Sequence, residues 1–271
     1  MEGPDPLAVT SDAARVVARL RAAGCVFAEA EAELLLAEAA VPEDVAESVR
    51  RRVSGTPLEH ILGWAEFAGQ RILVESGVFV PRRRTELLVG EAMRLLSFLG
   101  TSQSPLVVDL CCGSGAVGAV LGHRVPGIEL HAADIDPLAV RCAWRNVLPV
   151  GGTVHEGDLF DALPARLRGR VQVLAVNAPY VPTEAIRTMP PEARIHEPRI
   201  SLDGGGDGLE FHRRVAAEAS EWLSPGGHVL VETSRRQAAA TSSILAAAGL
   251  AVRTACSEEL EATAVIASRH A

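Results

Sequence analysis

Short apolar runs and helix-like segments alternate through the chain from about residue 106 onward. The runs are rich in β-branched residues and are bounded by turn residues, which is typical of strands buried on both faces. Strands are predicted over 106–110, 128–133, 152–155, 171–176, 227–232, 250–255 and 262–267, and helices over 115–123, 137–147, 209–223 and 236–248. The alternation predicts an α/β fold with a seven-stranded parallel sheet that helices cover on both faces.

The first 65 residues follow a different pattern. Three helix-like pieces lie within 10–53 and are separated by glycine, by proline and by residues that commonly cap helices. The stretch 67–81 alternates weakly between apolar and polar residues and contains a turn, which favours a β-hairpin. An amphipathic helix is then expected over 85–100. We predict a small helical domain over 1–65, a hairpin linker over 66–82 and the sheet domain over 83–271.

Composition limits the functions that such a chain can have. The 271 residues carry a formal net charge of −8, and a protein that depends on nucleic-acid phosphates is usually basic, so a nucleic-acid partner is not expected. No apolar run reaches the roughly 18–20 residues that span a bilayer, and the amino terminus lacks a signal-peptide pattern. The five cysteines form neither a disulfide framework nor a metal motif. We expect a cytoplasmic protein without a metal or a membrane contact, and the sequence does not indicate an oligomeric state.

A glycine-containing turn, which is neither GxGxxG nor a Walker loop, follows the first predicted strand of the sheet in "VVDLCCGSGAVGAVL". Ligands of open α/β sheets bind beyond the carboxyl ends of the strands, and Gly113 and Gly115 would let the main chain approach one closely. Asp134 ends the next strand, where a carboxylate can accept hydrogen bonds from both ribose hydroxyls of a nucleoside. Asp109 and Asp158 end neighbouring strands. The predicted nucleoside-cofactor site comprises Asp109, Cys111, Cys112, Gly113, Ser114, Gly115, Asp134, Asp158, Leu159 and Asn177.

The stretch "VNAPYVPT", residues 176–183, comes directly after another predicted strand. Asparagine and proline are common turn residues, so a plain turn is one interpretation. The other is a site that grips a planar amide or amine with an amide side chain, a rigid turn and an aromatic ring. The connection that starts here runs from 178 to 208, and connections of this length tend to be functional or mobile. Within it, the glycine-rich residues 203–208 are expected to form a flexible loop over the site.

Several segments together resemble a known family. "DLCCGSGAVG", "ADIDPLAV" and "GDLF" resemble the cofactor segments of class I S-adenosylmethionine-dependent methyltransferases, and "NAPY" resembles the Asn/Asp/Ser-Pro-Pro-aromatic signature of members that methylate planar nitrogens. With "GTPLEHILGWAEFAGQRILVESGVFVPRRRTELLV" and "EPRISLDGGGDGLEFHRRV", the chain resembles the HemK/PrmC family from about residue 50 to 240. The resemblance implies a Rossmann-like catalytic domain, a helical substrate-recognition domain and S-adenosylmethionine as cofactor. The implied reaction is methylation of a protein glutamine at its side-chain nitrogen (N5), in the Gly-Gly-Gln motif of a peptide-chain release factor.

The resemblance also assigns roles to the residues of "NAPY". A primary amide nitrogen is a poor nucleophile because its lone pair is delocalised into the carbonyl, so both of its N–H bonds need acceptors. The side chain of Asn177 is expected to accept one hydrogen bond and the main-chain carbonyl of Ala178 the other. Pro179 keeps Ala178 out of the helical region, and Tyr180 lies against the flat amide. No metal is needed, since a sulfonium is already an activated methyl donor.

Three positions depart from the family pattern. Ala178 stands in place of a proline, "PRRRTE" at 81–86 in place of Pro-Arg-Pro-acid-Thr-Glu, and Cys111 in place of a glycine or another small residue. The first two leave the acceptor open, so another protein, a small-molecule amide and a nucleic-acid amine are alternatives. A non-catalytic module that keeps the cofactor fold is a further alternative. The arginines of "PRRRTE" are either solvated or meet an acidic partner, and His196 and Glu197 are either structural or touch the substrate.

Overall fold

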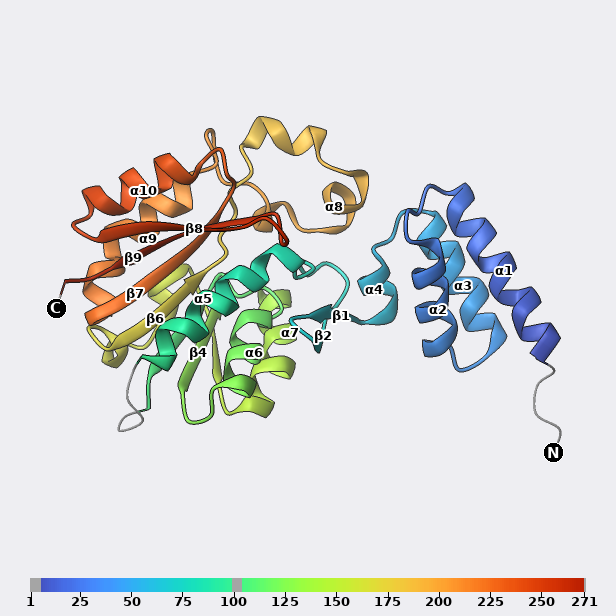
Figure 1. Ribbon diagram of the computed structural model, residues 1–271, viewed down its shortest axis with the longest axis horizontal. Helices are drawn as coiled ribbons and strands as arrows, with labels where there is room; N and C mark the ends of the chain where they lie inside the picture. The colour runs from blue at the N-terminus through green and yellow to red at the C-terminus, as the bar shows by residue number, and fades with distance from the viewer. Residues whose placement is uncertain (1–5, 99–103, 271) are drawn as a thin grey trace.

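The computed structural model describes residues 6–98 and 104–270. Its larger part is built on a seven-stranded sheet with the strand order β5-β4-β3-β6-β7-β9-β8 (Figure 1). The strands are β3 (Leu106–Leu110), β4 (Glu129–Asp134), β5 (Thr153–Glu156), β6 (Val171–Val176), β7 (Leu223–Thr233), β8 (Ala251–Ser257) and β9 (Ala262–Ser268). Each strand predicted from the sequence is present, and β7 starts earlier than predicted. The predicted fold class is therefore confirmed.

The sheet is parallel except at one edge. β3 pairs in parallel with β4 and β6, and β6 in parallel with β7, but β9 is antiparallel to both β7 and β8. The expectation of an entirely parallel sheet was wrong at this edge. The reason is local, because β8 and β9 are joined by a short turn over 258–261, and only antiparallel neighbours can be connected so tightly.

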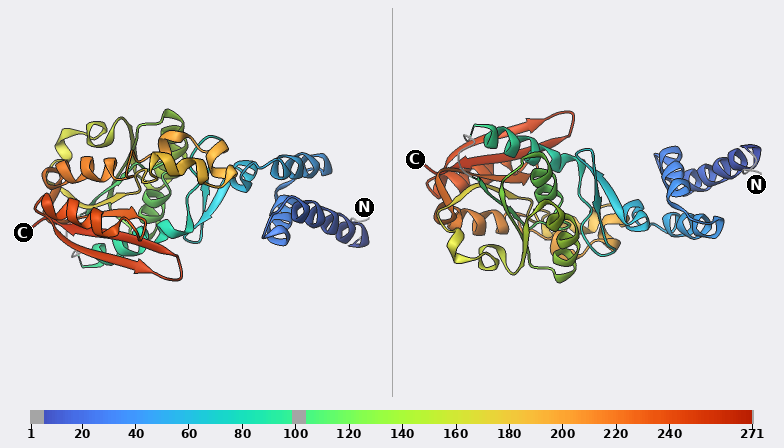
Figure 2. Two further views of the ribbon diagram at one scale, coloured as in Figure 1. Left: turned by 90° about the horizontal axis from the view of Figure 1, so that it is seen from above. Right: turned by 90° about the horizontal axis from the view of Figure 1, so that it is seen from below.

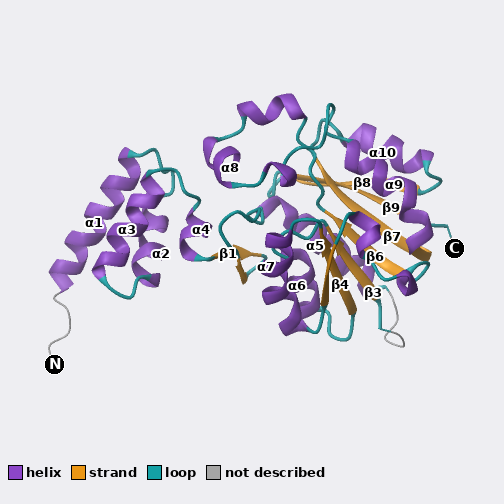
Figure 3. Ribbon diagram, turned by 180° about the vertical axis from the view of Figure 1, so that it is seen from behind, coloured by secondary structure: helices purple, strands orange, loops and turns teal. Residues whose placement is uncertain are grey.

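Helices cover both faces of the sheet (Figure 3). One core lies between the sheet and α5 (Glu86–Ser97), α6 (Ala116–Arg124) and α7 (Pro137–Val147), and the other lies between the sheet and α9 (Glu210–Trp222) and α10 (Ala238–Ala247). Val107 of β3 belongs to the first core and its neighbour Val108 to the second, and both are fully buried. Burial on both faces explains why the strands are continuous apolar runs. The predicted end of α5 at Gly100 lies outside the described residues.

The connectivity places a crevice at the carboxyl edge of the sheet. β3 leads through α6 to β4 on one side, whereas β6 lies on the other side of β3. In open α/β sheets, ligands bind where the strand order changes direction in this way. The segments that follow β3, β4 and β6 therefore meet at one point.

The amino-terminal part consists of α1 (Pro6–Ala22), α2 (Ala28–Glu38), α3 (Pro42–Val53) and the short α4 (Leu58–Leu62), and extends from one end of the α/β part (Figure 2). It has a core of its own, formed by Leu20, Ala32, Leu35 and Val49 among others. The expected hairpin follows as β1 (Trp64–Phe67) and β2 (Gln70–Leu73), so it begins before residue 66 and ends well before residue 82. Its tight turn uses Ala68 and Gly69, both with positive φ, which suits a two-residue hairpin loop.

The long connection after β6 has short elements of its own. It contains η5 (Thr183–Thr188), α8 (Pro191–His196) and η6 (Arg199–Ser201), and an isolated bridge pairs Val181 with Asp203. The glycine-rich residues 203–208 pack against the "NAPY" turn: a Cβ on Gly204 would lie 2.8 Å from Tyr180 Cα, and one on Gly208 only 2.3 Å from Tyr180 O. The expected loop over the site was wrong in this respect, because these glycines are needed for close packing beside the turn.

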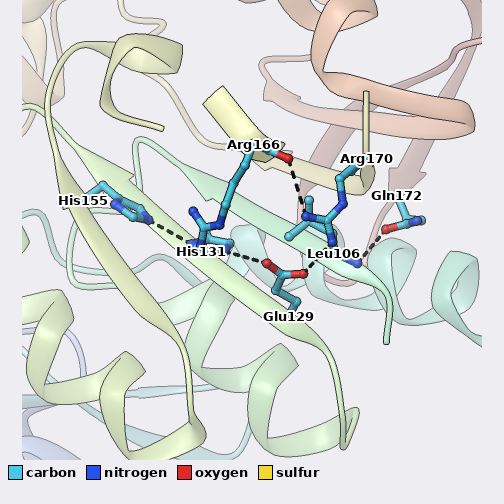
Figure 4. Close-up of polar contacts among 7 residues, drawn as sticks. All are labelled: Leu106, Glu129, His131, His155, Arg166, Arg170 and Gln172. Atoms are coloured by element: carbon cyan, nitrogen blue, oxygen red, sulfur yellow. Dashed lines mark hydrogen bonds and ion pairs between the residues drawn. The ribbon is translucent and has the colours of Figure 1, made fainter. Parts of the chain in front are cut away.

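A polar network crosses β4 and β5 away from the crevice (Figure 4). His131 Nδ1 lies 2.9 Å from His155 Nε2, and His131 Nε2 lies 3.3 Å from Glu129 Oε1. Arg170 donates a hydrogen bond to Glu129 Oε2 at 3.0 Å. Burial lowers the pKa of both histidines and so favours their neutral forms, while Glu129 opposes this shift at His131. Among the described helices, none is long and apolar enough to cross a membrane.

Candidate active site

A pocket opens at the carboxyl ends of β3, β4 and β6, as the connectivity predicts. The predicted cofactor contacts that line it are Asp109, Cys111, Cys112, Gly113, Ser114, Asp134, Asp158, Leu159 and Asn177. Ala178, Pro179 and Tyr180 line it as well. The fold therefore brings the two sequence patterns, the glycine-containing turn and "NAPY", to one cavity. We call the part near Asp134 the cofactor end and the part near Tyr180 the acceptor end.

Asp134 organises the cofactor end. Gly113 N–H donates to its Oδ2 at 2.8 Å, and Asp136 N–H donates to its Oδ1 at 3.0 Å. Burial raises the pKa of this carboxyl, while the two amide donors lower it. Each carboxylate oxygen can accept more than one hydrogen bond, so both retain capacity for a ligand hydroxyl. The arrangement fits a ribose held at the end of β4.

Asp109 lies deeper than Asp134. Its side chain is buried, and its Oδ2 accepts a hydrogen bond from Gly118 N–H at 2.8 Å in the first turn of α6. Burial raises the pKa of Asp109 to about 7, and the nearby charge of Asp134 adds to the shift. Asp109 therefore borders the pocket and at the same time fastens the start of α6 to β3.

Two residues of the turn play different parts from those expected. Gly115 does not line the pocket, although it was predicted to let a ligand approach. A Cβ there would lie 2.8 Å from Val147 Cγ2 and 3.1 Å from Ala143 Cβ, so this glycine permits α6 to pack on α7. Cys111 lines the pocket with φ 57°, a left-handed conformation that costs a non-glycine residue energy. Cysteine is thus strained at a position that suits glycine.

The third acid of the cofactor end is paired. Asp158 Oδ2 accepts a hydrogen bond from Arg214 Nη2 of α9 at 2.7 Å, and both residues line the pocket. Leu159, the next residue, is buried with φ 48°. Sequence reasoning missed Arg214, which belongs to an element more than 50 residues further along the chain.

Asn177 is held by a residue that comes much earlier in the chain. Its side-chain nitrogen donates a hydrogen bond to Thr85 Oγ1 at 3.2 Å, and Thr85 is buried at the start of α5. With its nitrogen bonded to Thr85, the side chain of this pocket-lining residue has Oδ1 available as an acceptor. No hydrogen bond from a described residue reaches either this oxygen or the main-chain oxygen of Ala178. The turn therefore carries two oxygens without a donor on residues that line the pocket.

Tyr180 is fixed by hydrogen bonds at its side-chain hydroxyl and at its main-chain oxygen. Its hydroxyl donates to Glu232 Oε1 at 3.1 Å, and its main-chain oxygen accepts from Gln237 Nε2 at 3.0 Å. Burial raises the pKa of the phenol, and the charge of Glu232 raises it further, so the hydroxyl stays protonated. Arg84 Nε donates to the same Glu232 oxygen at 3.3 Å. Glu232 thus ties together two pocket-lining residues.

Sequence reasoning missed Thr85, Glu232 and Gln237. Glu232 could have been found, because an acid near the carboxyl end of a buried strand is the pattern that identified Asp134. Thr85 gave no separate signal. Neither His196 nor Glu197 lines the pocket: Glu197 is buried behind Arg82, and its Oε1 accepts hydrogen bonds from Arg82 and from Val80 N–H. The suggested direct contact of Glu197 with substrate was therefore wrong for this structure.

The combination defines a class of protein. An acid at the end of β4 beside a glycine-containing turn, on this sheet, marks a protein that binds a nucleoside-containing cofactor. The sequence matches the methyltransferase small domain family over residues 70–209, and the chain belongs to this family. Membership implies S-adenosylmethionine as the cofactor, and the acids and main-chain groups of the cofactor end fit its ribose.

Individual relatives are similar over most of the chain. It is 37% identical over 245 residues to a 4-amino-L-phenylalanine/4-methylamino-L-phenylalanine methyltransferase of Streptomyces pristinaespiralis, covering 89% of this chain and 82% of the relative. It is 37% identical over 202 residues to a release factor glutamine methyltransferase of Geobacter sulfurreducens, covering 73% and 68%. A methyltransferase structure from Pyrococcus furiosus superposes with a TM-score of 0.55 at 15% identity, over 83% of this chain and all of that one, which supports the fold.

Proposed function

We propose that the protein transfers a methyl group from S-adenosylmethionine to the side-chain nitrogen (N5) of a glutamine in a protein, in the Gly-Gly-Gln motif of a peptide-chain release factor. The observation that carries this proposal is the hydrogen bond from Asn177 Nδ2 to Thr85 Oγ1, which leaves Oδ1 as an acceptor beside the carbonyl of Ala178. Two fixed acceptors suit a nitrogen that carries two N–H bonds. The relative from Geobacter sulfurreducens is named a release factor glutamine methyltransferase.

Holding the cofactor falls to the ends of β3, β4 and β5. Asp134 would accept the ribose hydroxyls, the main chain at Gly113 would approach the amino-acid portion, and Asp158 and Leu159 would border the base. When bound, S-adenosylmethionine supplies a methyl group already activated by its sulfonium. The protein then has to orient the acceptor and exclude water.

The acceptor end performs the orientation. Asn177 Oδ1 and the Ala178 carbonyl each accept one N–H of the glutamine amide, so the nitrogen lone pair points along the axis of the pocket. Tyr180, whose hydroxyl is fixed by Glu232, lies against the amide plane. Bound S-adenosylmethionine would supply the methyl group and leave as the neutral thioether, while Asn177 Oδ1 and the Ala178 carbonyl would hold the nitrogen as one amide proton passes to solvent. Positioning of this kind can supply on the order of 7–11 kcal/mol, and aimed acceptors stabilise the charge that develops on nitrogen.

The test is methylation of a purified release factor from the same organism. With S-adenosylmethionine, the intact factor should gain the mass of one methyl group, and tandem mass spectrometry should place it on the Gly-Gly-Gln glutamine. The matched control is the same factor with that glutamine changed to alanine, which should gain nothing. Equal labelling of both factors would exclude this glutamine as the acceptor.

A second candidate is N-methylation of an aromatic amine on an amino acid. It is favoured by the relative from Streptomyces pristinaespiralis, which aligns over 89% of this chain and thus over much of the amino-terminal part. An arylamine nitrogen is also planar and carries two N–H bonds, so the same acceptors would serve. Supplying 4-amino-L-phenylalanine under the conditions of the first assay separates the two candidates, because only one acceptor should turn over efficiently.

A further inference from the structure

The charged residues that line the pocket are sorted by sign. Asp109, Asp134, Asp136 and Asp158 lie at the cofactor end, where Asp158 is paired with Arg214. Among the described residues that line the pocket, Arg84 lies at the acceptor end, with its guanidinium 5.9 Å from the ring centre of Tyr180, whereas Arg82 lies over Phe79, which adjoins Gly113. Both arginines come from the segment that leads into α5. A bound acceptor therefore meets the guanidinium of Arg84 and no lining carboxylate at its own end.

The glutamates that bind these arginines lie in the protein interior and do not line the pocket. Arg84 Nε donates to Glu232 Oε1 at 3.3 Å, and Arg82 Nη2 donates to Glu197 Oε1. The side chains of Glu232 and Glu197 are 3% and 1% exposed, and neither residue lines the pocket. The arginines themselves are 46% and 34% exposed. The glutamates thus fix the arginines from the interior and leave the guanidinium edges toward the cavity.

Neither arginine is locked in a two-bond fork with its glutamate. Oε2 of Glu197 and Oε2 of Glu232 are both buried without a hydrogen-bond partner among the described residues, so each pair is joined through Oε1 alone. A guanidinium has five N–H donors in a planar array that matches a carboxylate. Enough donors remain on each arginine for a two-bond contact with an anion.

Aromatic rings set the direction of both groups. The guanidinium of Arg84 lies 5.9 Å from the ring centre of Tyr180, and that of Arg82 lies 5.1 Å from the ring centre of Phe79. Phe79 and Tyr180 both line the pocket. An anion held by Arg84 would therefore sit next to the ring that is proposed to lie against the methylated group.

We propose that Arg84 forms a carboxylate subsite, and that the acceptor carries a carboxylate close to the nitrogen that is methylated. The proposal rests on the proposed N-methyl transfer at this pocket. The carboxylate has two possible sources: the α-carboxylate of a free amino acid, or an acidic side chain near the methylated residue of a protein. The recognising chemistry is the same in both cases.

The test is a binding measurement that needs no turnover. The protein is loaded with S-adenosylhomocysteine and titrated calorimetrically with 4-amino-L-phenylalanine and with its carboxamide. In a second arm the titrant is the release factor, either unchanged or with the acids nearest its Gly-Gly-Gln loop changed to amides. In at least one arm the acidic form should bind about 10- to 100-fold more tightly, the range expected for hydrogen bonds to charged groups. The arm that shows the preference identifies the source.

Variants assign the preference to residues. Arg84→Gln should reduce it several-fold, and Arg84→Lys should restore it only in part because an ammonium lacks the planar fork. Arg83→Gln is the matched control, since Arg83 lies between Arg82 and Arg84, is 68% exposed, pairs with Glu259 and does not line the pocket. Unchanged affinity for S-adenosylhomocysteine shows that each variant is folded.

Two results would overturn the proposal. One is equal binding of the acidic and amide forms in both arms, and the other is an equal effect of Arg83→Gln and Arg84→Gln. Failure of the proposed function is distinguishable, because it would show as absent transfer to nitrogen in the methylation assays, whatever these binding constants are.

Discussion

The two ends of the pocket are held together in different ways. At the cofactor end, two of the three acids are fixed by main-chain amides, Asp134 by Gly113 N–H and Asp109 by Gly118 N–H, and the third, Asp158, is paired with Arg214. At the acceptor end, side chains are fixed by other side chains from distant parts of the chain, such as Asn177 by Thr85 and Tyr180 by Glu232.

The difference has a consequence for how such a protein can change. A cofactor end built on main-chain geometry is inherited with the fold, because every residue type except proline supplies a main-chain N–H. An acceptor end built on side-chain pairs can be altered one pair at a time without loss of cofactor binding. The comparison therefore predicts that substitutions at the two ends have separable effects.

The largest effect expected at the cofactor end is on stability, from Asp109. The folded pKa of about 7 lies above the usual pKa of an aspartate, 3.8, so the stabilisation present at low pH is lost as pH rises from about 4 through 7. Asp109→Asn removes the charge and should stabilise the ligand-free protein at pH 8 by up to about 4 kcal/mol, at about 1.4 kcal/mol per pKa unit.

The measurement is urea denaturation of both proteins at several pH values. His212 has the opposite effect on how stability depends on pH. Burial lowers its pKa to about 4, so the stability that it contributes is lost as pH falls below about 6.5. Below pH 6.5 the Asp109→Asn protein should therefore lose stability with falling pH more steeply than the wild type. Parallel pH curves for the two proteins would contradict the assignment to Asp109.

At the acceptor end, Asn177→Ala should lower the single-turnover rate about 100-fold or more, which corresponds to about 3 kcal/mol. The physical reason is the loss of one fixed acceptor at the reacting nitrogen. Affinity for S-adenosylmethionine, measured by calorimetry on the same sample, should stay unchanged within about two-fold. A fully active variant would refute the role of Asn177.

Asp134→Ala should have the converse effect. Loss of the ribose contacts should weaken S-adenosylmethionine binding by roughly 1–3 kcal/mol, the range for hydrogen bonds to a charged group. At saturating cofactor the single-turnover rate should recover most of its wild-type value, because the acceptor end is intact. Unchanged affinity would remove Asp134 from the cofactor site.

The smallest effect is expected from Thr85→Val, which deletes the hydroxyl that holds Asn177 and keeps a similar shape. Loss of this hydrogen bond should cost about 1 kcal/mol, or about five- to ten-fold in turnover, with cofactor affinity unchanged. Thr85→Ser retains the hydroxyl and is the matched control. If Ser and Val lower the rate equally, Thr85 acts through packing and does not orient Asn177.

The same contrast explains what the sequence could predict. The strands were predictable because burial on both faces requires apolar runs, as in "LVVDL" and "VQVLAV". The cofactor end followed, since parallel strands carry the acids after them to one edge. The antiparallel β8–β9 edge was missed because a strand's direction depends on the turn that precedes it.

The acceptor end was predictable only in part. "NAPY" could be recognised from its position after a strand. The partners that orient its side chains are far away in the sequence: Thr85 lies 92 residues before Asn177, and Glu232 lies 52 residues after Tyr180. No local sequence pattern indicates contacts between residues so far apart in the chain. The arginines of "PRRRTE" remained ambiguous for the same reason, because whether a guanidinium is solvated or lines a cavity depends on the segment that folds against it. The packing role of Gly115 likewise depends on another element, because the atoms that a Cβ at this position would clash with belong to α7.

The most direct test of the central claim is the identity of the atom that receives the methyl group. The protein is incubated with S-adenosylmethionine carrying a 13C methyl and with a 15N-labelled acceptor, either the release factor or 4-amino-L-phenylalanine. The account predicts that the transferred methyl signal is split by one-bond coupling to 15N, and that Asn177→Ala abolishes most of it. A methyl signal of full intensity without coupling to 15N would place the methyl on oxygen, sulfur or carbon, and would contradict a pocket built to hold a planar nitrogen.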